Sequence, residues 1–197
     1  VRELVKDEGR RDELMGTAFW LKVMGALGVL VILALAISFT SNDTFTNTLV
    51  FIIASATIFQ SFNVIDFYFQ SKVLSKYVVF ANVISLLISS VIKVILILNE
   101  APLIAFAWVI LFDSVVLAMG FICFYIKNNP LFKIKSVTFN KQTAIFLLKD
   151  SWPLMLSGML IAVYIKIDQV MIKEMINTEA VGQYAAAVKI SALWYFI

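Results

Sequence analysis

The sequence predicts an all-α polytopic membrane protein, and three observations support this fold class. Of the 197 residues, 61% are hydrophobic and only 15% are charged. The mean hydropathy is +0.94. A soluble domain carries about 25% charged residues and cannot hide so much apolar surface. Apolar runs of about 20 residues recur along the chain, and each is long enough to cross the hydrocarbon core of a bilayer.

Six membrane spans are predicted, after a charged segment at residues 1–13. In chain order they cover about 17–40, 47–69, 76–98, 103–126, 150–172 and a sixth from Val181 onward. The fifth is expected to begin at Ser151, whose hydroxyl can cap free N–H groups, with Pro153 in its first turn. All three prolines, Pro102, Pro130 and Pro153, fall at predicted span ends.

Short links join most of these spans, and one longer loop covers residues 127–149. The later part of this loop, 140–148, is compatible with a short helix lying at the membrane interface. The chain starts in a charged segment without Met or signal peptide, and it stops within an apolar run. We therefore expect it to be a fragment, the middle of a longer protein.

The distribution of charge over the loops predicts the orientation. The N-terminal segment holds four Lys or Arg residues, Lys72 and Lys76 bound the next link on the same side, and the 127–149 loop holds five lysines. The alternate links, 41–46 and 99–102, hold none. Because cytoplasmic loops are enriched in Lys and Arg, residues 1–16 and 127–149 are predicted to be cytoplasmic.

Composition and motifs exclude several classes of function. The chain has no His and one Cys, Cys123, which excludes disulfide frameworks and metal sites built from His or Cys. It contains no Walker A loop, no GxGxxG and no GxSxG motif. The formal charge of +3 does not indicate nucleic-acid binding, because most basic residues fall in loops. No metal, cofactor or nucleic-acid partner is therefore expected.

Charged residues inside the predicted spans are the candidates for function. Each costs about 2.5–3.5 kcal/mol near the bilayer centre, so it is expected to face protein or water. Lys22 and Lys93 lie near span ends, where a lysine can extend to the headgroups. Asp66 is either solvated at the end of its span or functional. Asp113 is near mid-span, either as a helix–helix hydrogen-bonding group or as a pathway or ion-coupling residue.

The fifth span holds an unusual polar patch. A helical step of about 100° places Ser157, Tyr164 and Asp168 on one stripe and places Lys166, Gln169 and Lys173 on another, nearly opposite. One stripe is expected to line a cavity, and the other to pack or extend outward. The alternative that the Lys166 side chain extends to the outer surface of the membrane, instead of lining a cavity, is left open. Lys189, about eight residues inside the sixth span, is the stronger cavity-lining candidate.

The intramembrane set mixes cations with acids: Lys93, Lys166 and Lys189 with Asp66, Asp113 and Asp168. Cations in a water-filled lumen attract anionic groups such as phosphates. The acids can pair with these lysines or carry coupling H⁺ or Na⁺. A pump for cationic drugs should have a lumen dominated by acids. The mixture therefore favours an anionic substrate.

Several motifs, in order, resemble those of a known family. They are RDELMG (11–16), QSFNVIDFYFQSKV (60–73), SWPLMLSG (151–158), IDQ (167–169) and AVGQYAAAVKISALWYF (180–196). Together they resemble the Wzx-type flippases of O-antigen or polysaccharide repeat units, in the multidrug/oligosaccharidyl-lipid/polysaccharide exporter superfamily. The resemblance covers most of the chain and is strongest over 151–196.

The resemblance implies a MATE-like transporter of twelve to fourteen helices in two lobes. Residues 1–126 would end the first lobe, 127–149 would connect the lobes, and 150–197 would begin the second. The implied function is not enzymatic. It is the transfer of undecaprenyl-diphosphate-linked oligosaccharide across the bacterial inner membrane by alternating access, coupled to H⁺ or Na⁺. Membrane lipids and polysaccharide assembly proteins are the implied further partners.

The resemblance also implies roles for residues. Lys166 and Lys189 would bind the diphosphate or acidic sugars, with Asp168, Gln169 and Tyr164 beside them on the translocation path. From their positions in the spans, and not from the resemblance, Asp113, Asp66 and Lys93 are candidates for ion coupling or charge pairing. Relatives can carry Arg at the lysine positions and an acid at the position of Ala192. Lys is a weaker ligand for phosphate than Arg, because it does not form bidentate hydrogen bonds. A multidrug/ion antiporter of the same superfamily and a membrane-embedded polysaccharide polymerase are the alternative functions.

Overall fold

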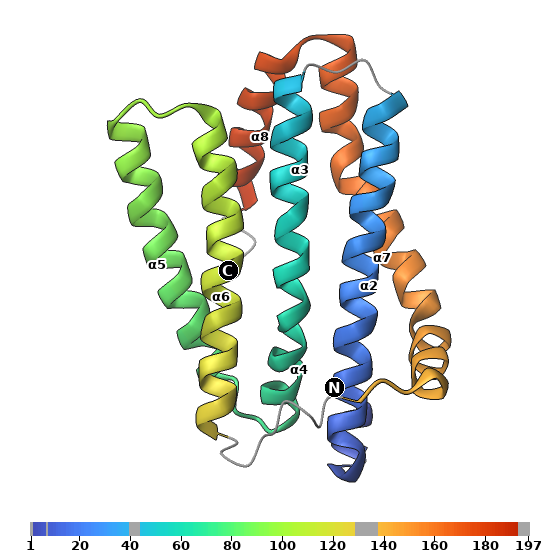
Figure 1. Ribbon diagram of the computed structural model, residues 1–197. Helices are drawn as coiled ribbons and strands as arrows, with labels where there is room; N and C mark the ends of the chain where they lie inside the picture. The colour runs from blue at the N-terminus through green and yellow to red at the C-terminus, as the bar shows by residue number, and fades with distance from the viewer. Residues whose placement is uncertain (1, 7, 40–43, 129–137, 193–197) are drawn as a thin grey trace. The chain divides into compact units, whose positions relative to one another are not determined.

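The computed structural model describes residues 2–6, 8–39, 44–128 and 138–192, and these form helices joined by short turns (Figure 1). The helices are α1 (Arg2–Lys6), η1 (Glu8–Arg10), α2 (Arg11–Phe39), α3 (Thr44–Phe59), η2 (Gln60–Asn63), α4 (Val64–Ser71), α5 (Lys76–Leu98), α6 (Leu103–Asn128), α7 (Lys141–Met175) and α8 (Thr178–Ala192), where η marks a 3₁₀-helix. The chain divides into two compact units, Val1–Ile145 and Phe146–Ile197.

Five helical stretches are long and apolar enough to cross a membrane. They are Arg11–Phe39, Thr44–Ser71, Lys76–Leu98, Leu103–Asn128 and Lys141–Met175. They confirm the prediction of an all-α, multi-pass membrane protein. The predicted sixth span corresponds to α8, and its continuation beyond Ala192 lies outside the described residues. Pro130 and the end of the first span at Thr40 also lie outside them.

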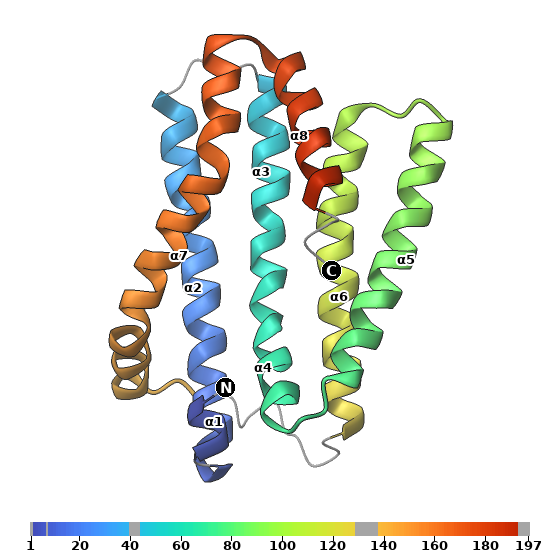
Figure 2. The same cartoon turned by 180° about the vertical axis from the view of Figure 1, so that it is seen from behind.

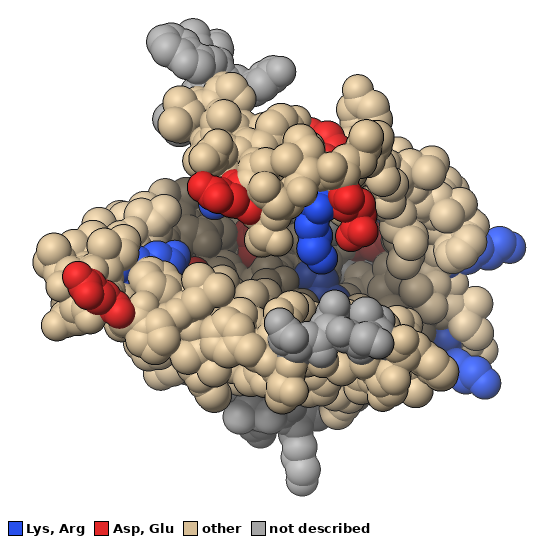
Figure 3. Space-filling view, turned by 90° about the horizontal axis from the view of Figure 1, so that it is seen from above, with Lys and Arg blue, Asp and Glu red and all other residues tan. Residues whose placement is uncertain are grey.

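The surface of the protein is predominantly apolar. Large hydrophobic side chains are exposed along every long helix, among them Phe39 (89% exposed) and Leu98 (78%). Seen from above, blue and red side chains occupy little of the surface (Figure 3). Such a surface is unfavourable in water but is matched by lipid hydrocarbon, in which the helices satisfy their own backbone groups.

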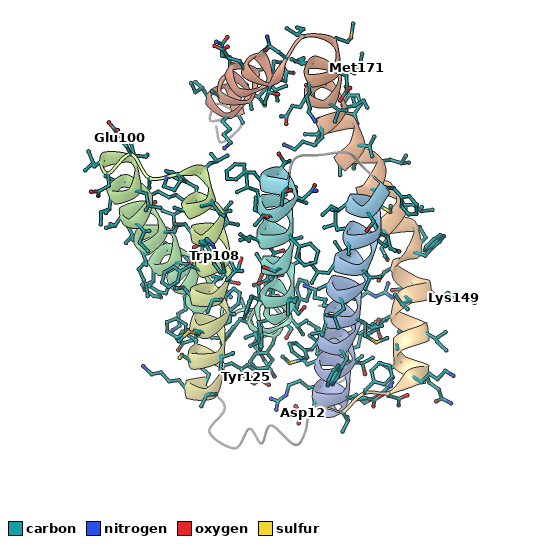
Figure 4. The ribbon with its side chains drawn as sticks, turned by 45° about the horizontal axis from the view of Figure 1, so that its top comes forward. Asp12, Glu100, Trp108, Tyr125, Lys149 and Met171 are labelled. Atoms are coloured by element: carbon teal, nitrogen blue, oxygen red, sulfur yellow. The ribbon has the colours of Figure 1, made fainter. Side chains whose placement is uncertain are left out.

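The helices of the first unit run alternately up and down, side by side (Figures 1 and 2). α3 packs against both α2 and α6, and α5 packs against α6. Asp12 and Tyr125 lie at one end of these helices and Glu100 at the other (Figure 4). The N-terminal segment, with four basic and five acidic residues, therefore shares an end with the α4–α5 link, which contains Lys72. We name this the basic end, after the Lys and Arg residues that predict its orientation.

The core of the first unit is an aromatic cluster near this basic end. Phe69 is completely buried, and Tyr68 and Tyr125 are 5% and 4% exposed. The rings of Tyr68 and Tyr125 meet edge to face with centroids 5.1 Å apart. The Arg11 guanidinium lies 5.5 Å from the centroid of the Tyr68 ring. Each such aromatic pair contributes about 0.5–1.5 kcal/mol beyond the burial of its area, so the cluster stabilises the packing of the helices at this end.

Small residues allow α5 and α6 to approach closely. A Cβ atom added at Gly120 would lie 3.3 Å from the Cβ of Ala81, which is tighter than ordinary contact. Ala81, Ser85 and Ser89 recur at four-residue spacing on α5, and all three are buried. Without a hydrophobic driving force in lipid, close backbone approach of this kind is a main source of helix association.

The start of α7 differs from the prediction. The helix begins at Lys141, and Pro153 lies inside it instead of in its first turn. Asn140 caps the helix, because its Oδ1 accepts the backbone N–H of Gln142 at 2.9 Å. The predicted interfacial helix at 140–148 is thus continuous with the fifth span. Pro153 costs one backbone hydrogen bond, which membrane helices tolerate where other groups satisfy the freed carbonyl.

The first turn of α7 is bound to the first turn of α2, within the first unit. Thr143 is 3% exposed. Its hydroxyl donates to Glu13 Oε1 at 2.5 Å and accepts from Arg10 Nη2 at 2.9 Å. The backbone N–H of Asn140 donates to Thr17 Oγ1 at 3.2 Å. These contacts attach the start of α7 to the basic end.

The second predicted span contains a 3₁₀ interruption that the sequence pattern did not predict. η2, at Gln60–Asn63, separates α3 from α4. Ser61 is 1% exposed, and its hydroxyl has no hydrogen-bond partner among the described residues.

Two helices end on residues in the left-handed conformation. Val73, with φ 57°, follows α4, and Glu100, with φ 50°, follows α5. In each case the next residue closes a helix cap: Leu74 N–H donates to Phe69 O at 2.8 Å, and Ala101 N–H donates to Leu96 O at 3.0 Å. Glycine is the usual residue at this position, so a β-branched Val73 is strained.

We expect Val73→Gly to stabilise the protein. The substitution relieves the left-handed strain of about 1 kcal/mol, and the 89% exposed side chain has little packing to lose. Val79→Gly, at a 57% exposed position within α5, is the matched control and should destabilise by about 1 kcal/mol. Thermal unfolding in detergent measures both, and a lower melting temperature for Val73→Gly would contradict the strain.

Gly120→Leu should separate α5 from α6, because its side chain would meet Ala81. Overpacking of this kind costs about 1–3 kcal/mol. Gly25→Leu on α2 is the control, since nothing lies within 4 Å of a Cβ at that position. Thermal unfolding should show a clear loss for the first variant and little change for the second. Equal melting temperatures would show that close approach at Gly120 is unimportant.

Candidate functional site

The acids inside the membrane spans accept hydrogen bonds from uncharged side chains. Gln70 donates to Asp66, Ser85 to Asp113 and Tyr184 to Asp168. The first two pairs lie in the first unit and the third lies in the second unit. The sequence placed all three acids among the candidate functional residues, but it identified none of these donors.

Asp113 joins α6 to α5. Ser85, which is 4% exposed, donates its hydroxyl to Asp113 Oδ1 at 2.5 Å and also lies 3.2 Å from the Asp113 carbonyl oxygen. The structure therefore shows the helix–helix hydrogen bond that was one of the two interpretations of Asp113. Such a bond contributes about 0.6 kcal/mol on average within membrane proteins. A role in ion coupling stays a prediction.

Asp66 forms a hydrogen bond within its own helix, α4, and Lys22 of α2 packs against the same helix. Gln70 Nε2 donates to Asp66 Oδ1 at 2.9 Å, one turn further along α4. The Lys22 ammonium lies 4.8 Å from the centroid of the Phe67 ring. It is also close enough to Asp66 for an electrostatic interaction. Lys22 is half-buried against α4, and its extension to the headgroups stays a prediction.

Asp168 joins α7 to α8. Its Oδ2 accepts the hydroxyl of Tyr184, and its Oδ1 accepts the backbone N–H of Gln169 at 2.8 Å. Asp168, Gln169 and Tyr184 are all half-buried. Tyr164, predicted to share a stripe with Asp168, is 80% exposed. The partner of Asp168 therefore comes from the neighbouring helix and not from its own stripe.

Among the described residues, the candidate cations form no hydrogen bond or ion pair with these acids. Lys166 on α7 and Lys189 on α8 are exposed, and Lys93 on α5 is half-buried. Lys166 is within electrostatic range of Asp168. Within the described part of the chain, neither Lys166 nor Lys189 forms an ion pair. The second unit thus has an exposed ammonium group on each of its two consecutive helices.

A signal for the missed partners is present in the sequence. In an antiparallel helical hairpin, residues at equal distances from the turn lie at the same height. Ser85 and Asp113 are 28 residues apart, centred on Asn99 in the α5–α6 turn. Asp168 and Tyr184 are 16 residues apart, centred on Ile176 in the α7–α8 turn. Pairing polar residues by this rule would have identified both donors.

The charged N-terminal segment is held by pairs outside the membrane. Lys6 and Arg2 each lie 3.1 Å from Glu3 Oε1, and these hydrogen bonds lower the pKa of the Glu3 carboxyl. Arg10 lies 3.0 Å from Glu13. Among the residues that the structure describes, no three acidic or Cys side chains gather as they would around a metal ion.

Comparison with known protein families gives a match. The family described as "Polysaccharide biosynthesis protein" matches residues 2–194, nearly the whole chain. A search of the curated proteins found no match. A search of the solved structures found none either.

We expect Ser85→Ala to destabilise the α5–α6 hairpin by about 1–3 kcal/mol, since it leaves the Asp113 carboxyl without its donor inside the membrane. Ser90→Ala, at an exposed position of the same helix, is the matched control and should have little effect. Thermal unfolding in detergent compares the two. A Ser85→Ala protein as stable as the control would mean that the Asp113 contact contributes nothing.

Proposed function

The chain belongs to the polysaccharide biosynthesis protein family, and from this membership we propose that it is part of a flippase for lipid-linked oligosaccharides. Its substrate would be an oligosaccharide repeat unit, of O-antigen or a related surface polysaccharide, linked through a diphosphate to undecaprenol. The flippase would move this unit across the bacterial inner membrane. The observation that carries the proposal is that Lys166 and Lys189, on two consecutive helices of the second unit, are exposed and form no ion pair among the described residues.

The chemistry of the two lysines fits a diphosphate. Each ammonium on a membrane helix is costly unless it faces water or a counter-charge. A diphosphate offers several anionic oxygens, and charge-assisted bonds to them are about twice as strong as neutral ones. Asp168 already accepts two hydrogen bonds. An incoming anion is then the natural partner for the lysines, with Gln169 and Tyr164 as neutral groups beside the path.

Charge at the helix ends supports the proposed orientation. The four basic residues of the N-terminal segment share an end of the first unit with the α4–α5 link. By the enrichment of Lys and Arg in cytoplasmic loops, this end faces the cytoplasm, together with residues 127–149. Residues 1–126 would then close a first lobe and 150–197 open a second, between which alternating access would take place.

Ion coupling would supply the driving force. Asp66, Asp113, Asp168 and Lys93 are the groups on the spans that could bind or exchange H⁺ or Na⁺. Moving one charge through 100 mV yields about 2.3 kcal/mol, which is sufficient to bias the direction of transport. Polysaccharide assembly proteins would receive the translocated unit, and the flippase itself would perform no covalent chemistry.

A complementation assay in cells that lack the flippase tests the proposal. In the intact gene, Lys166→Ala and Lys189→Ala should each lower surface glycan about tenfold or more, since each removes a charge-assisted contact to the diphosphate. Lys149→Ala is the matched control, because Lys149 is exposed on α7 before its apolar part.

The result that would overturn the proposal is equally direct. If both lysine variants assemble full-length surface glycan at normal expression, the two lysines do not bind the substrate. Export of cationic drugs by the wild-type protein, without any effect on surface glycan, would favour the multidrug antiporter instead.

A further inference from the structure

The start of α5 and the end of α6 lie side by side at the basic end (Figures 1 and 2). The Tyr77 ring, in the first turn of α5, meets the Phe124 ring of α6 with centroids 5.7 Å apart. Further along the pair, a Cβ at Gly120 would lie 3.3 Å from Ala81 Cβ. Gly120, Phe124 and Lys127 are spaced i, i+4 and i+7, which places them on one stripe of α6. Lys127 is therefore on the side of α6 that faces α5.

One exposed lysine from each helix lies next to this aromatic contact. The Lys76 ammonium lies 5.1 Å from the centroid of the Tyr77 ring. Lys127 follows Phe124 by about one turn of α6, or roughly 5 Å along the helix axis. Neither lysine forms an ion pair among the residues that the structure describes. The end of the α5–α6 hairpin thus carries two cations without a protein counter-charge.

The two helices supply no acid near these cations. Residues 71–80 and 118–128 contain Lys72, Lys76 and Lys127 and no Asp or Glu. The next acid on α6 is Asp113, about 21 Å from Lys127 along the helix axis. Glu100, in the α5–α6 turn, is at the opposite end of the hairpin (Figure 4). The local charge of the hairpin at the basic end is therefore positive.

The acids of α1 and α2 at the basic end have basic partners of their own. Glu3, Asp12 and Glu13 each lie within 3.1 Å of a Lys or Arg side chain. Asp12 is within electrostatic range of Tyr125 on α6. Lys127 is two residues further along, about 200° around the helix from Tyr125, so it is directed away from Asp12. These acids do not neutralise the lysines of the hairpin.

An apolar stripe continues from Lys76 along α5 toward the middle of the span. Phe80, Val83 and Leu87 follow Lys76 at i+4, i+7 and i+11, and they are 59%, 47% and 58% exposed. Within the described residues, α5 packs only against α6 and α4. A cation at the end of an exposed apolar stripe matches the chemistry of an anionic phospholipid, whose charged headgroup is joined to acyl chains.

We propose that Lys76 and Lys127 bind the phosphate of an anionic phospholipid headgroup at the basic end of the α5–α6 hairpin. The acyl chains lie along the apolar stripe of α5. The basic end is predicted to be cytoplasmic, and the cytoplasmic leaflet carries a negative surface potential from its anionic lipids. The lipid joins α5, which has few protein neighbours, to α6. It uses neither of the lysines proposed to bind the substrate.

The test measures lipid binding to the full-length protein by native mass spectrometry. Dissociation constants are compared for phosphatidylglycerol and phosphatidylcholine with the same acyl chains, because both have a phosphate but only phosphatidylglycerol has a net negative charge. We expect the wild type to prefer phosphatidylglycerol. Lys76→Gln and Lys127→Gln should each lower this preference about fivefold, the effect of one lysine near an anionic lipid.

Lys141→Gln is the matched control. Lys141 is exposed in the first turn of α7, which is attached to the same basic end through Thr143, but it lies outside the α5–α6 hairpin. Its replacement should leave the preference unchanged. Equal binding of the two lipids by the wild type, or an equal loss in Lys141→Gln, would show that the hairpin has no defined lipid site.

Thermal unfolding in nanodiscs separates lipid binding from folding. Phosphatidylglycerol in place of phosphatidylcholine should raise the melting temperature of the wild type. The double variant of Lys76→Gln and Lys127→Gln should keep the wild-type melting temperature in phosphatidylcholine and lose the increase in phosphatidylglycerol. A double variant that keeps the increase would show that these lysines do not bind the lipid. Equal destabilisation in both lipids would show that the lysines act in folding instead.

Discussion

A peptide group without a hydrogen-bond partner costs several kcal/mol in the hydrocarbon of a bilayer, and this constraint shapes the whole chain. Nearly every described residue is in a helix, which satisfies its own backbone. The departures occur where other groups are near. Pro153, inside α7, deprives the carbonyl of Lys149 of its usual donor. This carbonyl lies next to the charged and polar side chains of Asp150 and Ser151 in the sequence, and water or headgroups can replace the donor at such a position.

The same constraint explains why side-chain contacts carry so much of the information in this fold. With lipid around apolar helices, burial of hydrocarbon no longer distinguishes one helix pairing from another. Close contact at Gly120 and the bond from Ser85 to Asp113 specify the pairing of α5 with α6. The aromatic cluster around Phe69 specifies the packing at the basic end. Hydrophobicity places the helices in the membrane, and these few residues place them against each other.

The fold class followed from hydropathy because length and apolar composition are the physical requirements of a membrane helix. The beginning of α7 could not be predicted in this way, because Ser151 and Pro153 satisfy the sequence rules for a helix start as well as Asn140 does. The structure shows that the helix starts at the earlier position, where Asn140 caps it and Thr143 contacts Glu13. Among candidate site residues, charge within a span identified the acids and lysines. Their hydrogen-bond donors, Ser85 and Tyr184, are uncharged, so their presence in a span is not unusual. They can be recognised only by their position opposite the acid when the two helices of each hairpin are aligned about their turn.

The use of uncharged donors has an electrostatic consequence for a site that must hold an anion. If Asp168 paired with Lys166, the pair would be neutral, and a substrate would have to break it before it could bind. A hydroxyl from Tyr184 satisfies the carboxylate without consuming a cation. The second unit therefore keeps the charge of both lysines while its acid remains stabilised. If the proposed function is correct, acids and lysines can occur together at a site for an anionic substrate because Tyr184, a neutral donor, is the partner of Asp168.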